Sequence, residues 1–292
     1  MFWRLDVRSL IWRRFFLISP EARLKMRFNP FSEAAIFTGN VLRIAFRDGL
    51  GFFRRPQGFA FLAVFALIAG FFFYNQIVTF STICSHAGPS PALRRQLSIN
   101  EQVISSFFMD ICIVLMIMVP MITTRSFADE EESGSITLLL TAPVSPWSLV
   151  TGKFIGSLIP IWTMILITLP HVISTFILAD PELLPVLSGY AGLFLLSMAM
   201  AALGNMASAF AGTRVFSMAG GFGIFLLFWI VGWSDGYSEG TVAVLSRLST
   251  SIHLRTLMSG MVTLSDILFF PSLVLAALCM TVAALKIRKW RD

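Results

Sequence analysis

Charge is the scarcest feature of this 292-residue sequence: only 13% of its residues are Asp, Glu, Lys or Arg, whereas an average soluble domain has about a quarter. Hydrophobic residues make up 56% of the chain, and the mean hydropathy is +0.79. So few polar side chains cannot cover a water-soluble globule. The composition therefore excludes ordinary soluble enzyme folds and predicts an integral membrane protein.

Cysteine and histidine are also rare, at three residues each. Cys84, Cys112 and Cys279 lack the short spacings of zinc sites and redox motifs, so we expect them to be packing residues. A phosphate-binding loop, G-x-x-x-x-G-K-[ST], is missing as well: Gly152-Lys153 is followed by Phe154, and position 147 is Trp. We therefore predict no catalytic, metal or cofactor site in this chain, and no ATP hydrolysis by it.

The sequence contains several long runs of apolar residues, which soluble proteins lack. A helix needs ~20 mostly apolar residues to cross the ~30 Å hydrocarbon core of a bilayer. The runs do not alternate as the strands of a membrane β-barrel do. We therefore predict an all-α transmembrane domain over residues 57–292, with six helices. Their approximate ranges are 59–80, 103–123, 154–178, 186–210, 216–233 and 267–285.

The basic residues are distributed unevenly about these spans. With six spans, 18 of the 22 Lys and Arg fall on the side that holds both termini, and only four fall on the other side. Positive charge collects on the cytoplasmic side of membrane proteins. We therefore place both termini in the cytoplasm and the protein in the inner membrane. The net charge of +6 then marks a membrane face and not a nucleic-acid partner.

The segment before the first span is amphipathic. Over residues 31–56 apolar side chains recur on one side, and Arg43, Arg47 and Arg54 recur on the other, with Arg55 and Pro56 just before the span. Such a helix lies in the membrane interface, with its arginines toward anionic lipids. Residues 1–30 form a basic N-terminal extension, and a topological or an interfacial role for it stays open.

The loop between the second and third spans contains the only run of acids. Four consecutive acidic residues, Asp129 to Glu132, lie on the otherwise basic cytoplasmic side. Chemistry alone leaves two interpretations open: a docking surface for a cytoplasmic partner, or a solvated run of charge.

The block from Pro120 to Lys153 resembles the signature region of ABC-2 type transporter permeases. In that family the second span ends in Pro-x-x-Thr-x-Arg, and acids, Gly-Ser, a leucine run, Thr-x-Pro-Val-Ser and Gly-Lys follow. The matching residues are Pro120, Thr123 or Thr124, Arg125, Glu130, Glu131, Glu132, Gly134, Ser135, Leu138, Leu139, Leu140, Thr141, Pro143, Val144, Ser145, Gly152 and Lys153. The end of the chain (residues 248–290) is most similar to the gliding-motility and nitrous-oxide-reductase accessory permeases.

The resemblance implies a fold like that of type V ABC exporters. It implies a permease half that pairs with a second copy or a sister subunit, and a separate cytoplasmic ATPase that binds ATP and Mg²⁺. The loop from Arg125 to Lys153 would be the coupling segment, and the amphipathic helix at 31–56 the interface helix that borders the ATPase. Residues 212–216, which enter the fifth span, depart from the family pattern.

Two polar residues inside the spans suggest a pathway. Asp110 is the only carboxylate within a predicted span, and His171 lies within the third. Because intramembrane charges are costly, they face the bundle interior or water. Asp110 and His171 are thus candidate pathway residues, or polar packing contacts. They also motivate an alternative function, an ion-coupled secondary transporter; a membrane anchor of an envelope machine is a further alternative.

The outer loop 234–266 is long for a connector. Its apolar spacing predicts an amphipathic helix that lies on the outer leaflet or enters the membrane as a re-entrant element; the spacing is carried by Val244, Leu248, Ile252, Leu257 and Met261.

Overall fold

The computed structural model describes residues 30–86, 98–134, 144–179, 181–234 and 249–291, and every regular element within them is helical. The basic extension 1–29 lies outside these ranges. The elements are α3 (Pro30–Phe53), α4 (Pro56–His86), the π-helical η1 (Asn100–Ser105), α6 (Ser106–Thr123), α7 (Ala128–Glu132), α9 (Pro146–Ile167), α10 (Leu169–Leu178), α11 (Leu183–Ala211), α12 (Arg214–Ile230), the 3₁₀ turn η2 (Val231–Ser234), α14 (Thr250–Met258) and α15 (Leu264–Arg291).

Five of the helical stretches are long and apolar enough to cross a membrane. They run over Pro56–His86, Asn100–Glu132, Pro146–Ile177, Leu183–Ala211 and Leu264–Ile287. The expected span at 216–233 coincides with α12, which has only 17 residues and continues into the 3₁₀ turn η2. An all-helical membrane protein is therefore confirmed, whereas the count of six spans stays a prediction.

The predicted third span is longer and less regular than the sequence indicated. Its helix begins at Pro146, eight residues before the expected start, and it changes from α9 to α10 at Thr168. Pro170 explains the break, because proline has no N–H and its ring clashes with the carbonyl four residues earlier. The Thr168 hydroxyl meets the Tyr190 hydroxyl at 3.1 Å, which ties the break to α11.

Helix α11 is the centre of the bundle and contacts α6, α9, α12, α14 and α15. Its small residues allow this close packing. A Cβ on Gly189 would lie 2.5 Å from the Phe108 ring, and one on Gly204 would collide with Thr123. The uncharged, glycine- and alanine-rich sequence of α11 thus suits a helix that is surrounded by protein on most sides.

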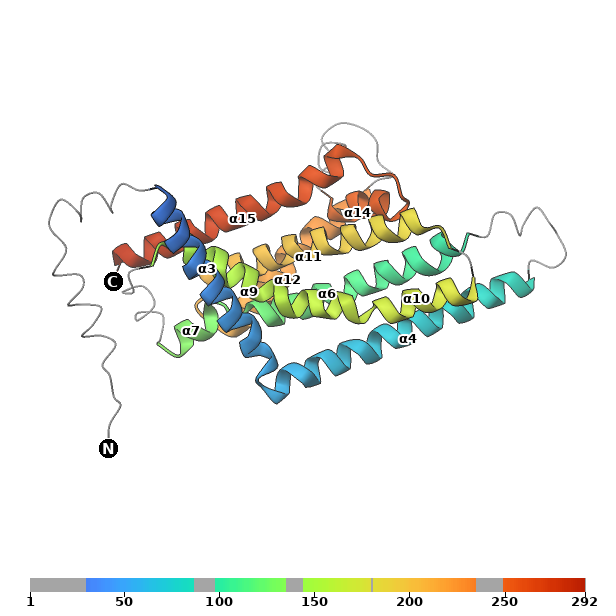
Figure 1. Cartoon of the computed structure of the whole chain (residues 1–292), viewed down its shortest axis with the longest axis horizontal. Coiled ribbons are helices and arrows are strands. Elements are labelled where there is room, and N and C mark those ends of the chain that lie inside the picture. Colours follow the sequence, from blue (N-terminus) through green and yellow to red (C-terminus); the bar gives the residue numbers. More distant parts are fainter. Residues whose placement is uncertain (1–29, 87–97, 135–143, 180, 235–248, 292) are drawn as a thin grey trace.

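Helix α3 crosses one end of the bundle at a steep angle and packs along α9 (Figure 1). Small residues again make the contact: a Cβ on Gly152 would lie 2.8 Å from Ile44 Cβ, and one on Gly156 would lie 3.1 Å from the Ala45 carbonyl. The expected helix before the first span is therefore present. Its position at the membrane surface stays a prediction.

The opposite end of the bundle carries α14 (Figure 1). Val244 and Leu248 of the predicted outer helix lie outside the described residues, but Ile252 and Leu257 lie in α14. Leu254 and Leu257 are buried against α11 and its neighbours, and Met261 is exposed. The helix is therefore packed into the bundle, and its placement on the outer leaflet or as a re-entrant element stays a prediction.

Candidate coupling site

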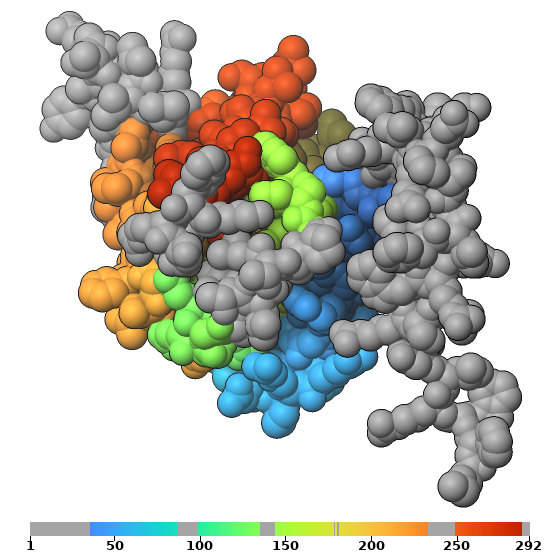
Figure 2. All heavy atoms as spheres, turned by 90° about the vertical axis from the view of Figure 1, so that its left-hand side faces the viewer, coloured from blue at the N-terminus to red at the C-terminus, as the bar shows by residue number. Residues whose placement is uncertain are grey.

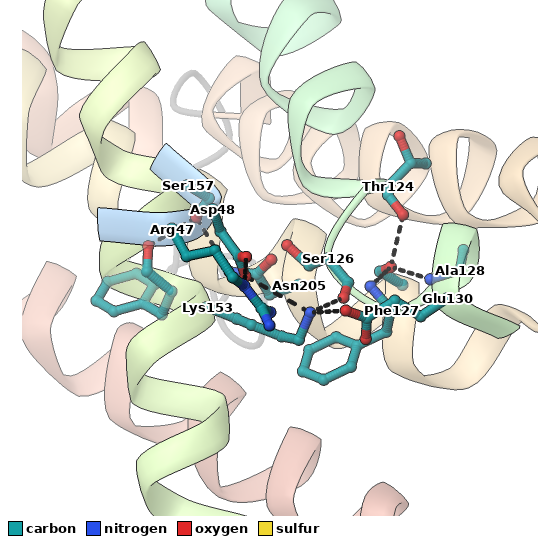
Figure 3. A network of polar contacts seen from close by, with 12 residues as sticks. Arg47, Asp48, Thr124, Ser126, Phe127, Ala128, Glu130, Lys153, Ser157 and Asn205 are labelled. Carbon is teal, nitrogen blue, oxygen red and sulfur yellow. Dashed lines mark hydrogen bonds and ion pairs between the residues drawn. The ribbon is translucent and has the colours of Figure 1, made fainter. Parts of the chain in front are cut away.

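The ammonium group of Lys153 is the centre of a polar network at the α3 end of the bundle (Figure 3). Only 2% of this side chain is exposed. Its Nζ donates to the Ser126 carbonyl at 2.5 Å and to Glu130 Oε1 at 2.7 Å, and lies 3.7 Å from Asp48 Oδ2 and 5.1 Å from the centre of the Phe127 ring. A buried ammonium needs such partners to offset its lost hydration. One side chain of α9 therefore joins α3 to the chain around α7.

Asp48 is shared between Lys153 and its neighbour on α3. The Nε of Arg47 lies 2.9 Å from Asp48 Oδ1, and this hydrogen bond raises the pKa of Arg47 above its usual value. Arg47 thus stays charged at every physiological pH, and the Asp48 carboxylate lies between two cations.

Two further acids of α7, Asp129 and Glu132, contact the start of α12. Arg214, the first residue of α12, places its Nε 2.8 Å from Asp129 Oδ1 and 2.9 Å from Glu132 Oε2. Its backbone N–H donates to Glu132 Oε1 at 2.8 Å. Arg214 is 56% exposed, so these contacts are much more hydrated than the Lys153 pair.

Ser208 of α11 holds the start of α7. Its hydroxyl oxygen accepts the backbone N–H groups of Phe127 and Ala128 at 3.1 and 2.9 Å, and it donates to the Thr124 carbonyl at 3.2 Å. Unpaired N–H groups at a helix start need such acceptors. The turn between α6 and α7 is thereby anchored in the bundle core.

These contacts bear on the two interpretations of the acidic run. Asp129, Glu130 and Glu132 all make ion pairs within the chain. They are therefore not a simple run of solvated charge, and docking of a cytoplasmic partner on this segment stays a prediction. Its carboxylates fasten α7 to α9 and α12.

The predicted coupling residues divide at position 134. Gly134 follows α7 with φ of +70°, a conformation that favours glycine. Val144, which is half-buried, and Lys153, which is buried, follow later in the chain. Ser135, Leu138, Leu139, Thr141 and Pro143 lie outside the described residues. The structure thus brings Glu130 and Lys153 together and leaves the leucine run unplaced.

An open cavity of about 850 Å³ lies beside this network, between α3, the α6–α7 turn, α9 and the start of α12. Figure 2 looks onto this end of the molecule, with α3 in blue and the α6–α7 segment in green. Of the four arginines predicted for the interface helix, Arg47, Arg54 and Arg55 line the cavity, and Arg43 is exposed outside it. Arg125 also lines it, with its guanidinium 5.7 Å from the centre of the Phe52 ring.

The sequence did not indicate four members of the network: Asp48, Ser126, Ser208 and Arg214. Asp48 had a weak signal, because it is the only acid in the basic part of the amphipathic helix. Arg214 is the only cation between the fourth and fifth predicted spans, and it is expected on the same side of the membrane as the acidic run. Ser208 gave no signal, since its partners are backbone groups some 80 residues away.

The two candidate pathway residues are not brought together. Asp110 Oδ2 accepts a hydrogen bond from Gln76 Nε2 at 2.7 Å. His171 lies against the rings of Phe73 and Phe107, with centroids 5.3 and 6.0 Å away. Within the described ranges no hydrogen bond joins Asp110 to His171, so the geometry does not build the relay on which the secondary-transporter alternative depends.

The end of the bundle that carries α14 holds a buried polar pair, which has no role in the function predicted from the sequence. His253 Nδ1 lies 2.6 Å from Asp266 Oδ1, and Thr263 donates to the other carboxylate oxygen at 2.5 Å. The imidazole also stacks on Phe269 at 4.3 Å. Both members are buried, and the pair fastens α14 to the start of α15.

Comparison with known proteins gives one result that covers this site. The sequence model of the "ABC-2 family transporter protein" matches residues 40–237, which is more than half of the chain and includes the whole Lys153 network. Comparison with curated proteins gives no match. Long apolar helices, a polar network between α3, α7 and α9, and this family match agree with one another. The chain belongs to the ABC-2 transporter family and is a multi-pass membrane permease of that family.

Proposed function

We propose that this chain is the transmembrane permease subunit of an ABC exporter in the inner membrane. A separate cytoplasmic ATPase would bind ATP and Mg²⁺ and drive it, and a second copy or a sister subunit would complete the transport path. The observation that carries the proposal is the buried Lys153–Glu130 pair, because it connects the segment that follows the second span to the helix of the third span.

The network suits the transmission of a mechanical signal. A movement of α7 is resisted by three separate attachments: Lys153 on α9, Arg214 on α12, and Ser208 on α11. Since α3 contacts α9 and shares Lys153 through Asp48, it would move with the same unit. A coupling requires an element that two sites can bias, and α7 with its attachments is the element that we assign.

We assign different roles to the acidic and the apolar residues of the coupling segment. The acids would position the segment, and the following leucines, Leu138 and Leu139, would contact the ATPase. This assigns the docking contact to apolar residues, because the ion pairs occupy Asp129, Glu130 and Glu132.

The end that holds α3 and α7 would be cytoplasmic, in line with the excess of basic residues there. Exposed Arg43 on α3 and the arginines at the α3–α4 turn would face anionic lipids. The branch of gliding-motility and nitrous-oxide-reductase accessory permeases remains our proposal for its nearest functional class.

Co-purification with a candidate ABC ATPase, sought first among the genes beside that of this protein, tests the proposal. We expect the wild-type chain to form a complex and to change the ATPase rate. Leu139→Glu should abolish the complex, because a charge would enter an apolar contact. Glu130→Gln should keep the complex but weaken the effect of the permease on ATP hydrolysis.

The matched control is Glu101→Gln, which removes an exposed carboxylate at the opposite end of the bundle. It should leave both complex formation and the ATPase rate unchanged. The absence of a complex with the wild-type chain would refute the proposal, as would normal coupling in both Leu139→Glu and Glu130→Gln.

A further inference from the structure

The cavity beside the coupling network has an excess of positive charge. Its lining contains six cationic side chains, from Arg47, Arg54, Arg55, Arg125, Lys153 and Arg214, and three carboxylates, from Asp48, Asp129 and Glu130. The three carboxylates pair with Arg47, Arg214 and Lys153. Within the described part of the chain, Arg54, Arg55 and Arg125 have no carboxylate partner. Among the described residues, the cavity therefore has three arginines without a compensating anion.

Arg125 is the most informative of the three. Its side chain is half-buried, and its guanidinium contacts the Phe52 ring but makes no hydrogen bond or ion pair within the described ranges. A guanidinium with five N–H donors loses hydration when it is half-buried, and an aromatic ring replaces only part of it. An oxyanion in the cavity would supply the missing acceptors in the forked geometry that guanidinium groups bind best.

The position of the cavity specifies the source of the anion. Arg54 and Arg55 form the turn between α3 and α4, and Pro56 starts a 31-residue apolar helix that is long enough to span a membrane. The turn thus lies where a chain passes from the membrane surface into the bilayer, which is the level of lipid phosphates.

The apolar part of the lining agrees with this source. Phe52, Ile122 and Pro160 line the same cavity as the arginines. A soluble anion would gain nothing from these side chains, whereas the glycerol backbone and the first methylenes of a phospholipid would pack on them.

We propose that this cavity binds the phosphate of one anionic phospholipid headgroup, with Arg125, Arg54 and Arg55 as its ligands. The bound lipid would bridge α3, the α3–α4 turn and the start of the coupling segment, next to the Lys153 network. The inference deepens the lipid contact of the proposed function and rests on the orientation proposed there. It replaces a general attraction of basic residues to the membrane with one defined site that binds a single lipid per chain.

The test is lipid binding to the purified full chain in detergent, measured by native mass spectrometry during titration with phosphatidylglycerol or phosphatidylcholine. We expect one phosphatidylglycerol per chain to bind at least about tenfold more tightly than phosphatidylcholine. Arg125→Gln should weaken that binding about tenfold, since one charge-assisted hydrogen bond to phosphate is worth about this factor. Arg125→Lys, which keeps the charge but loses the fork, should give an intermediate loss and covers the case in which Arg125→Gln does not fold.

Arg43→Gln is the matched control, because it removes the same charge from an exposed position of α3 outside the cavity. It should leave the tight site unchanged. Equal losses in Arg43→Gln and Arg125→Gln would overturn the proposal, because they would show only general attraction to a charged surface.

Two further arms separate the lipid from other anions. Inorganic phosphate should not displace phosphatidylglycerol beyond the effect of chloride at equal ionic strength; specific displacement by phosphate would overturn the lipid assignment. Unchanged lipid binding in Arg125→Gln, together with loss of the ATPase complex, would assign the cavity to an acidic protein segment instead. The lipid measurement uses the permease alone, so a failure to bind lipid and a failure to bind the ATPase are distinguished.

Discussion

The buried pair between Lys153 and Glu130 can be tested by removing each partner and then both. Glu130→Ala leaves the Lys153 ammonium, 2% exposed, with the Ser126 carbonyl, the more distant Asp48 and the Phe127 ring. Lys153→Met removes the charge but keeps an apolar stem of similar length. The Glu130 side chain is 21% exposed, so it can turn toward water when Lys153 is lost.

These environments give unequal expected costs. Loss of one partner of a buried ion pair costs about 3–5 kcal/mol, and we expect Glu130→Ala to lie near the lower limit because the other partners of Lys153 remain. Lys153→Met should cost about 1–2 kcal/mol, since the freed carboxylate can regain hydration. The 2.7 Å pair has a Coulomb energy of about 6 kcal/mol at an effective dielectric of about 20. After its desolvation cost, we expect a coupling energy of about 2 kcal/mol, which makes the double variant about 1 kcal/mol less stable than Lys153→Met but no less stable than Glu130→Ala.

The assay is a double-mutant cycle on the full chain in mixed micelles, with reversible unfolding by titrated dodecyl sulfate and helicity as the signal. The matched control is the cycle of Arg214→Gln and Glu132→Gln, an ion pair of similar length (2.9 Å) whose arginine is 56% exposed. Its coupling energy should be below about 1 kcal/mol. A coupling below about 0.5 kcal/mol for the buried pair, or one no larger than that of the exposed pair, would refute the reasoning from burial.

Three further predictions concern other contacts; the first two are measured by the same unfolding assay and the third by hydrogen exchange. Ser208→Ala should cost about 1–3 kcal/mol, because two buried N–H groups lose their acceptor; an unchanged free energy of unfolding would show that another acceptor replaces the hydroxyl. Gly152→Ala should destabilise the α3–α9 contact by about 1–3 kcal/mol, whereas Gly39→Ala, with nothing within 4 Å, should be neutral or stabilising; equal effects would contradict close helix packing. Asp266→Asn should speed hydrogen exchange in α14, because the 2.6 Å contact with His253 weakens; unchanged protection of α14 would show that apolar packing alone holds it.

The membrane class and most of the helices follow from the sequence, because a hydrocarbon core selects long apolar runs without regard to their neighbours. The same argument predicts the helix at 31–56, since its apolar side recurs at helical spacing. Sequence reasoning does not predict the break at Thr168, because the effect of Pro170 on the helix depends on the contact between Thr168 and Tyr190 of α11. It also leaves α12 unsettled, because 17 residues lie at the lower limit of a span.

The coupling site shows a sharper division between sequence and structure. The resemblance of the 120–153 block identified both Glu130 and Lys153, but a pattern along the chain does not show that they touch across 23 residues. It left a docking surface and a solvated run of charge as alternatives for the acidic run, and the partners of these acids come from distant segments: Arg214 from the start of α12 and Lys153 from α9. The sequence shows which residues are charged, but it does not show which charges form ion pairs in the fold.

The sequence by itself determined the solvent in which this protein folds and the family to which its signature block points, and it predicts the side of the membrane on which the basic residues lie. Those properties depend on composition and local order. The tertiary structure alone decided which charges are neutralised and which are left over. Helix packing buries Lys153 against Glu130 and leaves Arg125 half-buried, with no acid beside it among the described residues; this difference in burial and partnership, not in residue type, distinguishes the proposed coupling contact from the proposed lipid site.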